Sequence, residues 1–450
     1  MILTGTPARD YLLSLHQTGQ YTFELSGLNS GSIRDQMVRA RLLVDRLAGI
    51  EMIGPKRELL VIGGGAAGAT AALAARRKGI DVTLIEKEDF VFARQRGVDR
   101  WLDPVEYDWP QDHWQQRMVP SPELPYSADS GANLAVLWEQ EVHKELVRSA
   151  TSKFELITGV DARELSFLTM PRGLGVTPWD GDPLAVRVFG AAISCVGMSA
   201  ERVALAAPSP AYAGPEFWAN DTLEDPHLGL TRAAGTKVRV LVSGGGDGAQ
   251  QDLLRILTGS FGARLAAKIG LADFRGFDLR DVLTAEDYAR RSRAWGDETT
   301  DFTVSDAKLD AAYTRLAQDV LHQHGTAARS LLRSDVSVRW VLGGRSISPS
   351  YGLNRLLSIV FVMLHSSQEG QAVAILGKVA SIVPSTGHSP PVCGSCFGQP
   401  HDVDLIPWGS STATSLGTFD AIVLRHGIVQ RPLFDLAPVR NQTVPFQGPD

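Results

Sequence analysis

The chain has 450 residues, which is long enough for two or three domains that each bury a core of their own. Apolar residues make up 44% and charged residues 21%, as in globular proteins, and the net charge of -6 argues against a general nucleic-acid binder, which would carry a basic excess. Three cysteines exclude a disulfide scaffold, and no stretch resembles a signal peptide or a membrane span, so we expect a cytoplasmic protein without a nucleic-acid or membrane partner.

Residues 1–56 predict a helical arm. Apolar residues recur at helical spacing over residues 33–47, and Ser32 with Asp35 has the pattern of a helix cap. We expect the arm to pack on the core or on a second copy of the chain, which would make the protein a homo-oligomer. Its arginines are expected to lie on a solvated helix face rather than to bind a ligand: Arg34, Arg39, Arg41 and Arg46.

Residues 58–88 predict a dinucleotide-binding unit, because a strand, a glycine turn, a helix and a second strand follow one another. Gly63, Gly65 and Gly68 have the G-x-G-x-x-G spacing, which permits a tight turn, a close approach of backbone to a pyrophosphate, and close packing of helix on strand. Glu86 follows at the end of the second strand, where a carboxylate binds a ribose hydroxyl. The alternative is a glycine-rich turn in an α/β unit that binds no ligand.

The next stretch, residues 90–127, is rich in arginine and aromatic residues and has no clear periodicity. A loop that leaves the carboxyl end of the second strand would run over the nucleotide site and could stack on a flavin or substrate. The alternative is that its aromatic side chains bury an irregular loop. The residues in question are Arg94, Arg96, Arg100, Trp101, Tyr107, Trp109, His113 and Trp114.

Residues 153–197 predict an antiparallel meander and then a buried strand over 191–196 that returns to the first sheet and ends at Gly197. Cys195 on that strand is expected to be a small buried residue rather than a nucleophile. The opening pattern then recurs, since a strand over 237–242 meets a second glycine loop and a helix. Gly244, Gly246 and Ala249 have the G-x-G-x-x-A spacing of that loop.

This order resembles the two-dinucleotide-binding-domain flavoproteins, a group that includes thioredoxin reductase-like enzymes and class B flavin monooxygenases. The resemblance implies an α/β fold in which a Rossmann-like FAD domain, residues 57–200 and 385–450, contains an inserted NAD(P)H domain, residues 201–384. It implies that FAD is bound by Gly63, Gly65, Ala66, Ala67, Gly68, Glu86, Lys87, Arg94 and Gly197. It further implies that NADPH or NADH lies at Gly244, Gly246 and Ala249, and that a strand over 421–424 brings Arg425 and His426 to the flavin.

The second half departs from that family in three ways. No clear strand ending in an acid or a basic cluster follows the second glycine loop, although Arg264, Lys268, Arg275 and Arg280 could neutralise a 2'-phosphate. Asp247 within the loop would repel a pyrophosphate unless it points away. A polar helical insertion over about 265–335 matches no family pattern and could form a lid, a substrate wall or an interface. The second unit is therefore either a nicotinamide site or a structural one.

Cys393 and Cys396 form a C-x-x-C pair near His388 and His401. Four interpretations stay open: a redox pair, a metal site made by Cys393, Cys396 and His401, an ordinary loop, and a substrate-site loop. The sequence identifies no general base or nucleophile.

The whole pattern predicts an FAD-dependent, NAD(P)H-linked oxidoreductase that acts on a small molecule, with a monooxygenase as one form. The alternatives are a flavin- or nucleotide-binding sensor or interaction protein without turnover, and an NAD-dependent dehydrogenase without flavin.

Overall fold

A computed structural model forms two compact units, and each is described by itself. The first contains residues 1–104, 117–200 and 429–450, and the second contains residues 105–116 and 201–428. The structure describes residues 7–25, 32–110, 118–119, 123–179, 182, 184–197, 200–205, 212–231, 233, 235–271, 273–295, 302–344, 347, 350–385, 399–429 and 432–434. Among these residues, none of the helices is both long and apolar enough to cross a membrane.

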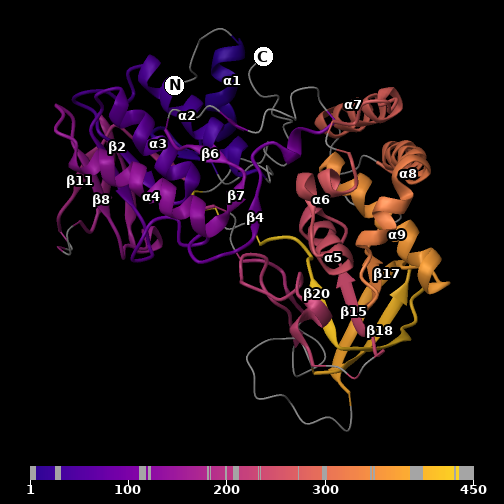
Figure 1. Ribbon diagram of the computed structural model, residues 1–450. Helices are drawn as coiled ribbons and strands as arrows, with labels where there is room; N and C mark the ends of the chain where they lie inside the picture. Colours follow the sequence, from indigo (N-terminus) through magenta and orange to yellow (C-terminus); the bar gives the residue numbers. More distant parts are fainter. Residues whose placement is uncertain are drawn as a thin grey trace. The chain divides into compact units, whose positions relative to one another are not determined.

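The first unit is built on a parallel sheet (Figure 1). Its strands lie in the order β1 (Thr22–Glu24), β12 (Ala191–Ser194), β2 (Leu59–Ile62), β3 (Val82–Ile85) and β8 (Phe154–Ile157). The residues of β2, β3 and β12 are all buried, as in a parallel sheet covered on both faces. Its helices are α1 (Pro7–His16), α2 (Ile33–Gly49), α3 (Ala66–Arg77) and α4 (Gly131–Val147), and α3 packs between α2 and α4.

The predicted meander covers this parallel sheet as a three-stranded antiparallel sheet. Its strands are β9 (Ser166–Met170), β10 (Gly173–Thr177) and β11 (Arg187–Phe189). Leu174 and Phe189 of the meander share one hydrophobic core with Leu60 and Ile62 of β2. The short elements of this unit are β4 (Trp101–Leu102), β5 (Met118–Val119), β6 (Tyr126–Ser127), β7 (Asp129–Ser130) and a 3-10 turn, η3 (Ala162–Glu164).

The N-terminal residues are not a separate arm. The cap prediction for α2 is confirmed, since the Ser32 hydroxyl accepts from the Asp35 N–H. However, β1 pairs in parallel with β12, with Phe23 opposite Ile193, so this part of the chain completes the sheet. The expectation of a solvated arginine face is wrong for Arg39, which is buried with α2 packed on α3.

The second unit has a mixed sheet in the order β19 (Thr414–Phe419), β18 (His401–Pro407), β17 (Ala374–Pro384), β16 (Val336–Leu342), β15 (Val238–Ser243) and β20 (Ala421–Leu424). Strands β17, β16, β15 and β20 are parallel, whereas β18 and β19 are antiparallel. Its helices are α5 (Asp247–Thr258), α6 (Gly262–Lys268), α7 (Arg280–Trp295), α8 (Thr303–Leu331) and α9 (Gly352–Glu369). Helices α5 and α9 lie side by side (Figure 1). The short elements are β13 (Ala204–Leu205), β14 (Tyr212–Ala213), η1 (Glu106–Asp108) and η4 (Pro226–Gly229).

Both α/β units confirm the predicted fold class, but the predicted boundary at residue 385 is wrong. The chain returns to the first unit only at Val429, because β18, β19 and β20 belong to the second sheet. Strand β20 pairs in parallel with β15, with Leu424 opposite Ser243. The apolar strand over 421–424 was therefore identified correctly and assigned to the wrong sheet.

Candidate functional site: two glycine turns at the ends of parallel strands

The first glycine turn lies where β2 ends between its two neighbours. Gly63 has a φ of +100°, and a Cβ on it would stand 2.6 Å from the carbonyl oxygen of Cys195, just after β12. The Gly63 N–H donates to the carbonyl of Ile85 at the end of β3, 2.8 Å away. Since β2 connects first to β3 on one side and pairs with β12 on the other, this is the switch point at which open α/β sheets bind ligands.

The helix that follows has an open N-terminus. Gly65 is its N-cap, no side chain caps it, and a Cβ on Gly65 would meet no atom within 4 Å. Gly68 is packed tightly, since its Cβ would lie 1.8 Å from the carbonyl oxygen of Gly63. Ala66 and Ala67 begin α3 with no acidic residue in the first turn. The N–H groups and the positive dipole end therefore fit a pyrophosphate.

Glu86 is buried beside this turn, with 9% of its surface exposed. One carboxylate oxygen accepts from the Gly64 N–H and the other accepts from the Glu88 N–H at 3.0 Å. Each carboxylate oxygen has two lone pairs, so Glu86 retains acceptor capacity for a ribose hydroxyl while its side chain is fixed. Lys87 is exposed and pairs with Glu88 at 3.0 Å.

The loop after β3 lies against the same turn. Phe92 donates its N–H to the carbonyl of Gly64 at 3.0 Å, and a Cβ on Gly64 would stand 2.8 Å from Val91. Phe92 is itself buried, with its ring 5.5 Å from that of Trp138. Phe92 therefore packs inside the loop as an aromatic core residue, whereas Arg94 is exposed.

The other residues of that loop are not gathered at the first turn. Arg100 is buried, and Arg96 is exposed over the ring of Phe90. Tyr107 and Trp109 lie in the second unit. His113 and Trp114 lie outside the described residues.

The second glycine turn repeats the geometry of the first. Gly244 has a φ of +134°, and a Cβ on it would stand 2.2 Å from the carbonyl oxygen of Arg425, just after β20. Gly246 is the N-cap of α5, without a capping side chain. Ala249 is fully buried where the first turn has Gly68. A further similarity between the two units is a glycine with positive φ shortly after β12 and β20. Gly197 has a φ of +73° and Gly427 a φ of +87°.

Asp247 points away from a phosphate position. Its Oδ1 accepts from the Tyr351 N–H and from the Asn354 side-chain amide, both at 2.9 Å, so the carboxylate is turned toward the start of α9. Burial raises the pKa of Asp247 to about 6, against the opposing effect of these two hydrogen bonds. The expected repulsion is thus avoided by the orientation of the side chain.

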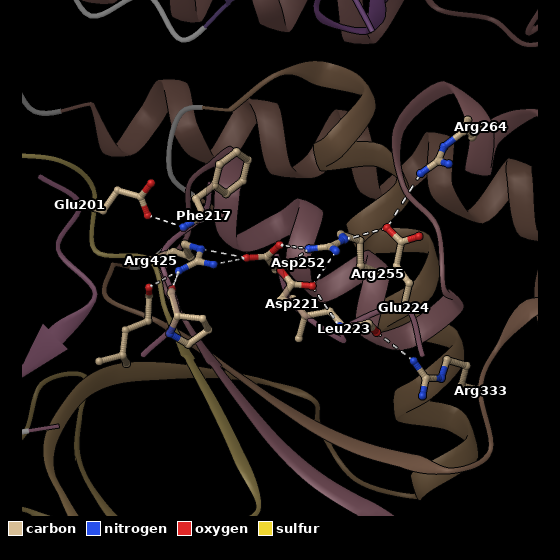
Figure 2. Close-up of polar contacts among 12 residues, drawn as sticks. Glu201, Phe217, Asp221, Leu223, Glu224, Asp252, Arg255, Arg264, Arg333 and Arg425 are labelled. Atoms are coloured by element: carbon tan, nitrogen blue, oxygen red, sulfur yellow. Dashed lines mark hydrogen bonds and ion pairs between the residues drawn. The ribbon is translucent and has the colours of Figure 1, made fainter. Parts of the chain in front are cut away.

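The resemblance assigned Arg425 to the FAD-binding domain, and this assignment is wrong. Arg425 lies in the second unit and ends β20 inside a buried ion-pair network (Figure 2). Its Nε donates to Asp252 at 2.8 Å, and Asp252 also pairs with Arg255 at 3.1 Å. The sequence showed the strand end but not this network, because the partners of Arg425 and Arg255 lie far from Arg425 in the sequence.

The network continues through Arg255 (Figure 2). That guanidinium also pairs with Asp221 at 2.7 Å and with Glu224 at 2.8 Å. Although burial lowers it, these carboxylates hold the pKa of Arg255 above its usual range. The network therefore joins α5 to the segment before β15 and has a structural role.

His426 also belongs to the second unit and not to the FAD-binding domain to which its strand was assigned. Its Nε2 lies 2.9 Å from the Ser243 hydroxyl at the end of β15, and burial lowers its pKa. The residue is therefore a neutral imidazole at the edge of the second glycine turn at neutral pH.

Three of the four basic residues that could neutralise a 2'-phosphate lie near carboxylates. Arg275 and Arg280 are exposed and pair with Asp273 and Asp278, and Arg264 lies 3.9 Å from Glu224. Lys268 ends α6 at the surface.

The second strand of this nucleotide unit is β16, which the sequence analysis missed. Helices α6, α7 and α8 follow α5 before this strand begins, so β16 comes much later in the sequence than the second strand of a usual βαβ unit. Its signal was the run V-S-V-R-W-V-L-G-G-R, which ends in glycine and carries no acid at its end. Trp340 of β16 donates its indole N–H to the carbonyl of Gly244 at 2.7 Å.

The cysteines divide between the described and undescribed parts of the chain. Cys195 is buried, and burial raises the pKa of its thiol, so its predicted role as a small core residue fits. Cys393, Cys396 and His388 lie outside the described residues, whereas His401 begins β18 and contacts the Gln399 carbonyl at 2.8 Å. Within the described ranges, no group of three or more possible ligands could hold a metal ion.

Comparison with known proteins agrees with this geometry in the first unit. Residues 58–149, which span the first glycine turn, Glu86 and the loop after β3, match the family of FAD dependent oxidoreductases. The match confirms the flavoprotein resemblance for this segment and agrees with FAD as its cofactor. No curated protein matches the chain.

The solved structures that resemble this chain include two kinds of reductase. Thioredoxin reductase from T. acidophilum is 11% identical, with 83% of this chain and 78% of that chain covered and a TM-score of 0.34. Bacillithiol disulfide reductases from Bacillus cereus and Staphylococcus aureus are 11% and 13% identical. They cover 83% and 87% of this chain, 78% and 80% of their own, with TM-scores of 0.39 and 0.38. Similarities at this level carry no argument about activity.

Proposed function

We propose that the chain is an FAD-dependent oxidoreductase whose first unit binds FAD and whose second unit binds NADPH or NADH. The observation that carries the proposal is the repeated turn: Gly63 and Gly244 each adopt a positive φ against the carbonyl that follows the last parallel strand. Each turn leads into a helix with a glycine N-cap and no capping side chain. Such a turn leaves room for a pyrophosphate at a helix N-terminus.

The residues of the first turn fit FAD. Gly65 has open space around it, and Glu86 is held by two backbone N–H groups with acceptor capacity remaining. The match with FAD dependent oxidoreductases supports the same assignment. In the second turn, the inward orientation of Asp247 removes the main electrostatic objection to a dinucleotide.

The flavin, when bound, would supply the redox chemistry, taking hydride from the nicotinamide and passing electrons to oxygen, as in a monooxygenase, or directly to a small-molecule substrate. The protein would hold both dinucleotides by backbone N–H groups and keep water from the reacting rings. Cys195 has no part in this chemistry, because its thiol is buried and its pKa is raised.

The visible spectrum of the purified chain tests the proposal. We expect the yellow absorption of oxidised flavin, and its loss when NADPH or NADH is added without oxygen. A bound flavin that neither nicotinamide bleaches would favour a flavin-binding sensor over an enzyme. A colourless protein that does not take up added FAD would contradict both. If the nicotinamide does bleach the flavin, measurement of hydrogen peroxide and of substrate oxidation in air separates an oxidase from a monooxygenase.

A further inference from the structure

The segment 105–110 leaves the first unit and is built into the second. Strand β4 before it and helix α4 after it belong to the first unit, yet Val105–Gln116 is part of the second. Val105, Glu106 and Trp109 are all buried. A segment of the FAD half of the sequence is thereby a fixed component of the other nucleotide unit.

Two anchors hold this segment. Glu106 accepts a hydrogen bond from the Gln251 side chain of α5 at 3.1 Å. Its other carboxylate oxygen packs against Gly262, where an added Cβ would come within 2.1 Å of that oxygen. Trp109 is 2% exposed, with its ring 4.9 Å from Phe274. Only glycine at position 352 leaves room for Trp109, since a Cβ there would come within 3.0 Å of the indole.

Tyr107 lies between the two anchors and is only half-buried. Its ring centroid is 4.2 Å from that of Tyr351, the N-cap of α9, which is also half-buried. The N–H of Tyr351 donates to Asp247, the residue that follows the Gly246 N-cap of α5. The aromatic pair is thus connected by one hydrogen bond to the second glycine turn.

We infer that Tyr107 and Tyr351 form an aromatic platform for the adenine of the nicotinamide dinucleotide. The adenosine half of a dinucleotide lies between the glycine turn and the end of the second strand. Helix α9 follows that strand, β16, and Tyr351 is at its start, so the pair lies on the adenosine side of the turn. Every base offers a π-face to an aromatic side chain, and Tyr107 is held in place by buried neighbours before the ligand arrives.

This inference rests on the proposed binding of a nicotinamide dinucleotide by the second unit. The test uses the full chain with FAD bound and the variants Tyr107→Leu, Tyr107→Phe and Tyr351→Leu. Tyr288→Leu is the matched control, because Tyr288 is 41% exposed on α7 of the same unit. Calorimetry measures the Kd of NADPH, NADH and 2',5'-ADP. The rate of flavin reduction is measured with reduced nicotinamide mononucleotide, which has no adenosine.

We expect Tyr107→Leu and Tyr351→Leu to raise the Kd of each of the three adenosine-containing ligands by about 5- to 100-fold, which is the range for loss of one stacking contact with a base. Tyr107→Phe and Tyr288→Leu should bind like the unchanged chain, and reduction by the mononucleotide should be the same in all variants. FAD content and thermal unfolding show whether a variant is folded. If Tyr107→Leu is misfolded, the Kd values of Tyr351→Leu test the platform instead. Unchanged Kd values in a folded leucine variant would overturn the platform alone, whereas an unchanged chain that binds none of the ligands would overturn the proposed function as well.

Discussion

Gly68 faces the carbonyl of Gly63 so closely that a Cβ on Gly68 would lie 1.8 Å from that oxygen. The contact joins the first turn of α3 to the end of β2 and fixes the distance between them. Real Cβ atoms never approach backbone this closely, and neither partner can move without shifting the helix N-terminus that faces the ligand. The turn therefore depends on glycine here for steric reasons.

We predict that Gly68→Ala abolishes FAD binding. The added methyl group forces α3 away from β2, so the N–H groups at the start of α3 no longer point at the pyrophosphate. The measurement is the ratio of flavin to protein absorption after purification and after titration with FAD. Gly49→Ala is the matched control: Gly49 is also helical and in the same unit, and its Cβ would meet no atom within 4 Å. Equal flavin content in the two variants would contradict the prediction.

A second prediction concerns Arg425, which forms a buried ion pair with Asp252. Arg425→Ala leaves the fully buried Asp252 with one partner fewer, and loss of one partner from a buried ion pair costs about 3–5 kcal/mol. Urea unfolding of the second unit should shift accordingly, while the folded variant keeps its FAD content. Arg280→Ala breaks an exposed pair with Asp278 and should leave the unfolding transition almost unchanged, because solvent screens that pair. Loss of flavin from folded Arg425→Ala protein would count against the structural role.

The sequence predicted what depends on local pattern and missed what depends on pairing between distant segments. Both glycine turns, the cap at Ser32 and the meander follow from spacing, turn residues and alternation within short windows. The place of β20 does not, since an apolar strand of four residues fits either parallel sheet and only its pairing with β15 decides. Strand β16 was missed because four helices, α5 to α8, lie between the glycine turn and this strand in the sequence. The position of Tyr107 was likewise missed, because residues 105–116 belong to the second unit and no local sequence pattern predicts this.

A third prediction uses the raised pKa of Asp247. An acid whose pKa is about 6 in the folded chain and 3.8 as a model value holds its proton more strongly when folded. Ionisation of Asp247 therefore lowers the free energy of unfolding. This loss is absent below about pH 4, grows as the pH rises toward 6, and stays constant above pH 6. The shift corresponds to about 3 kcal/mol at neutral pH.

The variant Asp247→Asn removes this titration and keeps an oxygen that can accept from the Tyr351 N–H. We expect the free energy of unfolding of Asp247→Asn, relative to the unchanged chain, to rise by up to about 3 kcal/mol between pH 4 and pH 7. Denaturant unfolding at pH 4, 5, 6 and 7 measures it. A difference between the two proteins that stays constant over this range would show that Asp247 does not titrate there.

The last prediction concerns the choice between NADPH and NADH. Strand β16 ends at Leu342 and is followed by Gly343 and Gly344, so the described residues at this strand end carry no acidic side chain of the kind that an NADH site has there. Arg345 comes next in the sequence and lies outside the described residues. An acid-free strand end followed by a cation favours a 2'-phosphate, so we expect the flavin to be reduced more efficiently by NADPH than by NADH.

Gly343 offers a direct test, because a Cβ on it would meet no atom within 4 Å and its φ is not positive. Gly343→Asp should lower the ratio of kcat/KM for NADPH to that for NADH by roughly 10-fold or more, since a carboxylate repels the 2'-phosphate and accepts from a free ribose hydroxyl. Gly343→Asn has the same shape without the charge and should leave the ratio near that of the unchanged chain. If aspartate and asparagine shift the ratio of kcat/KM for NADPH to that for NADH equally, the effect is steric. The end of β16 then does not distinguish a 2'-phosphate from a 2'-hydroxyl.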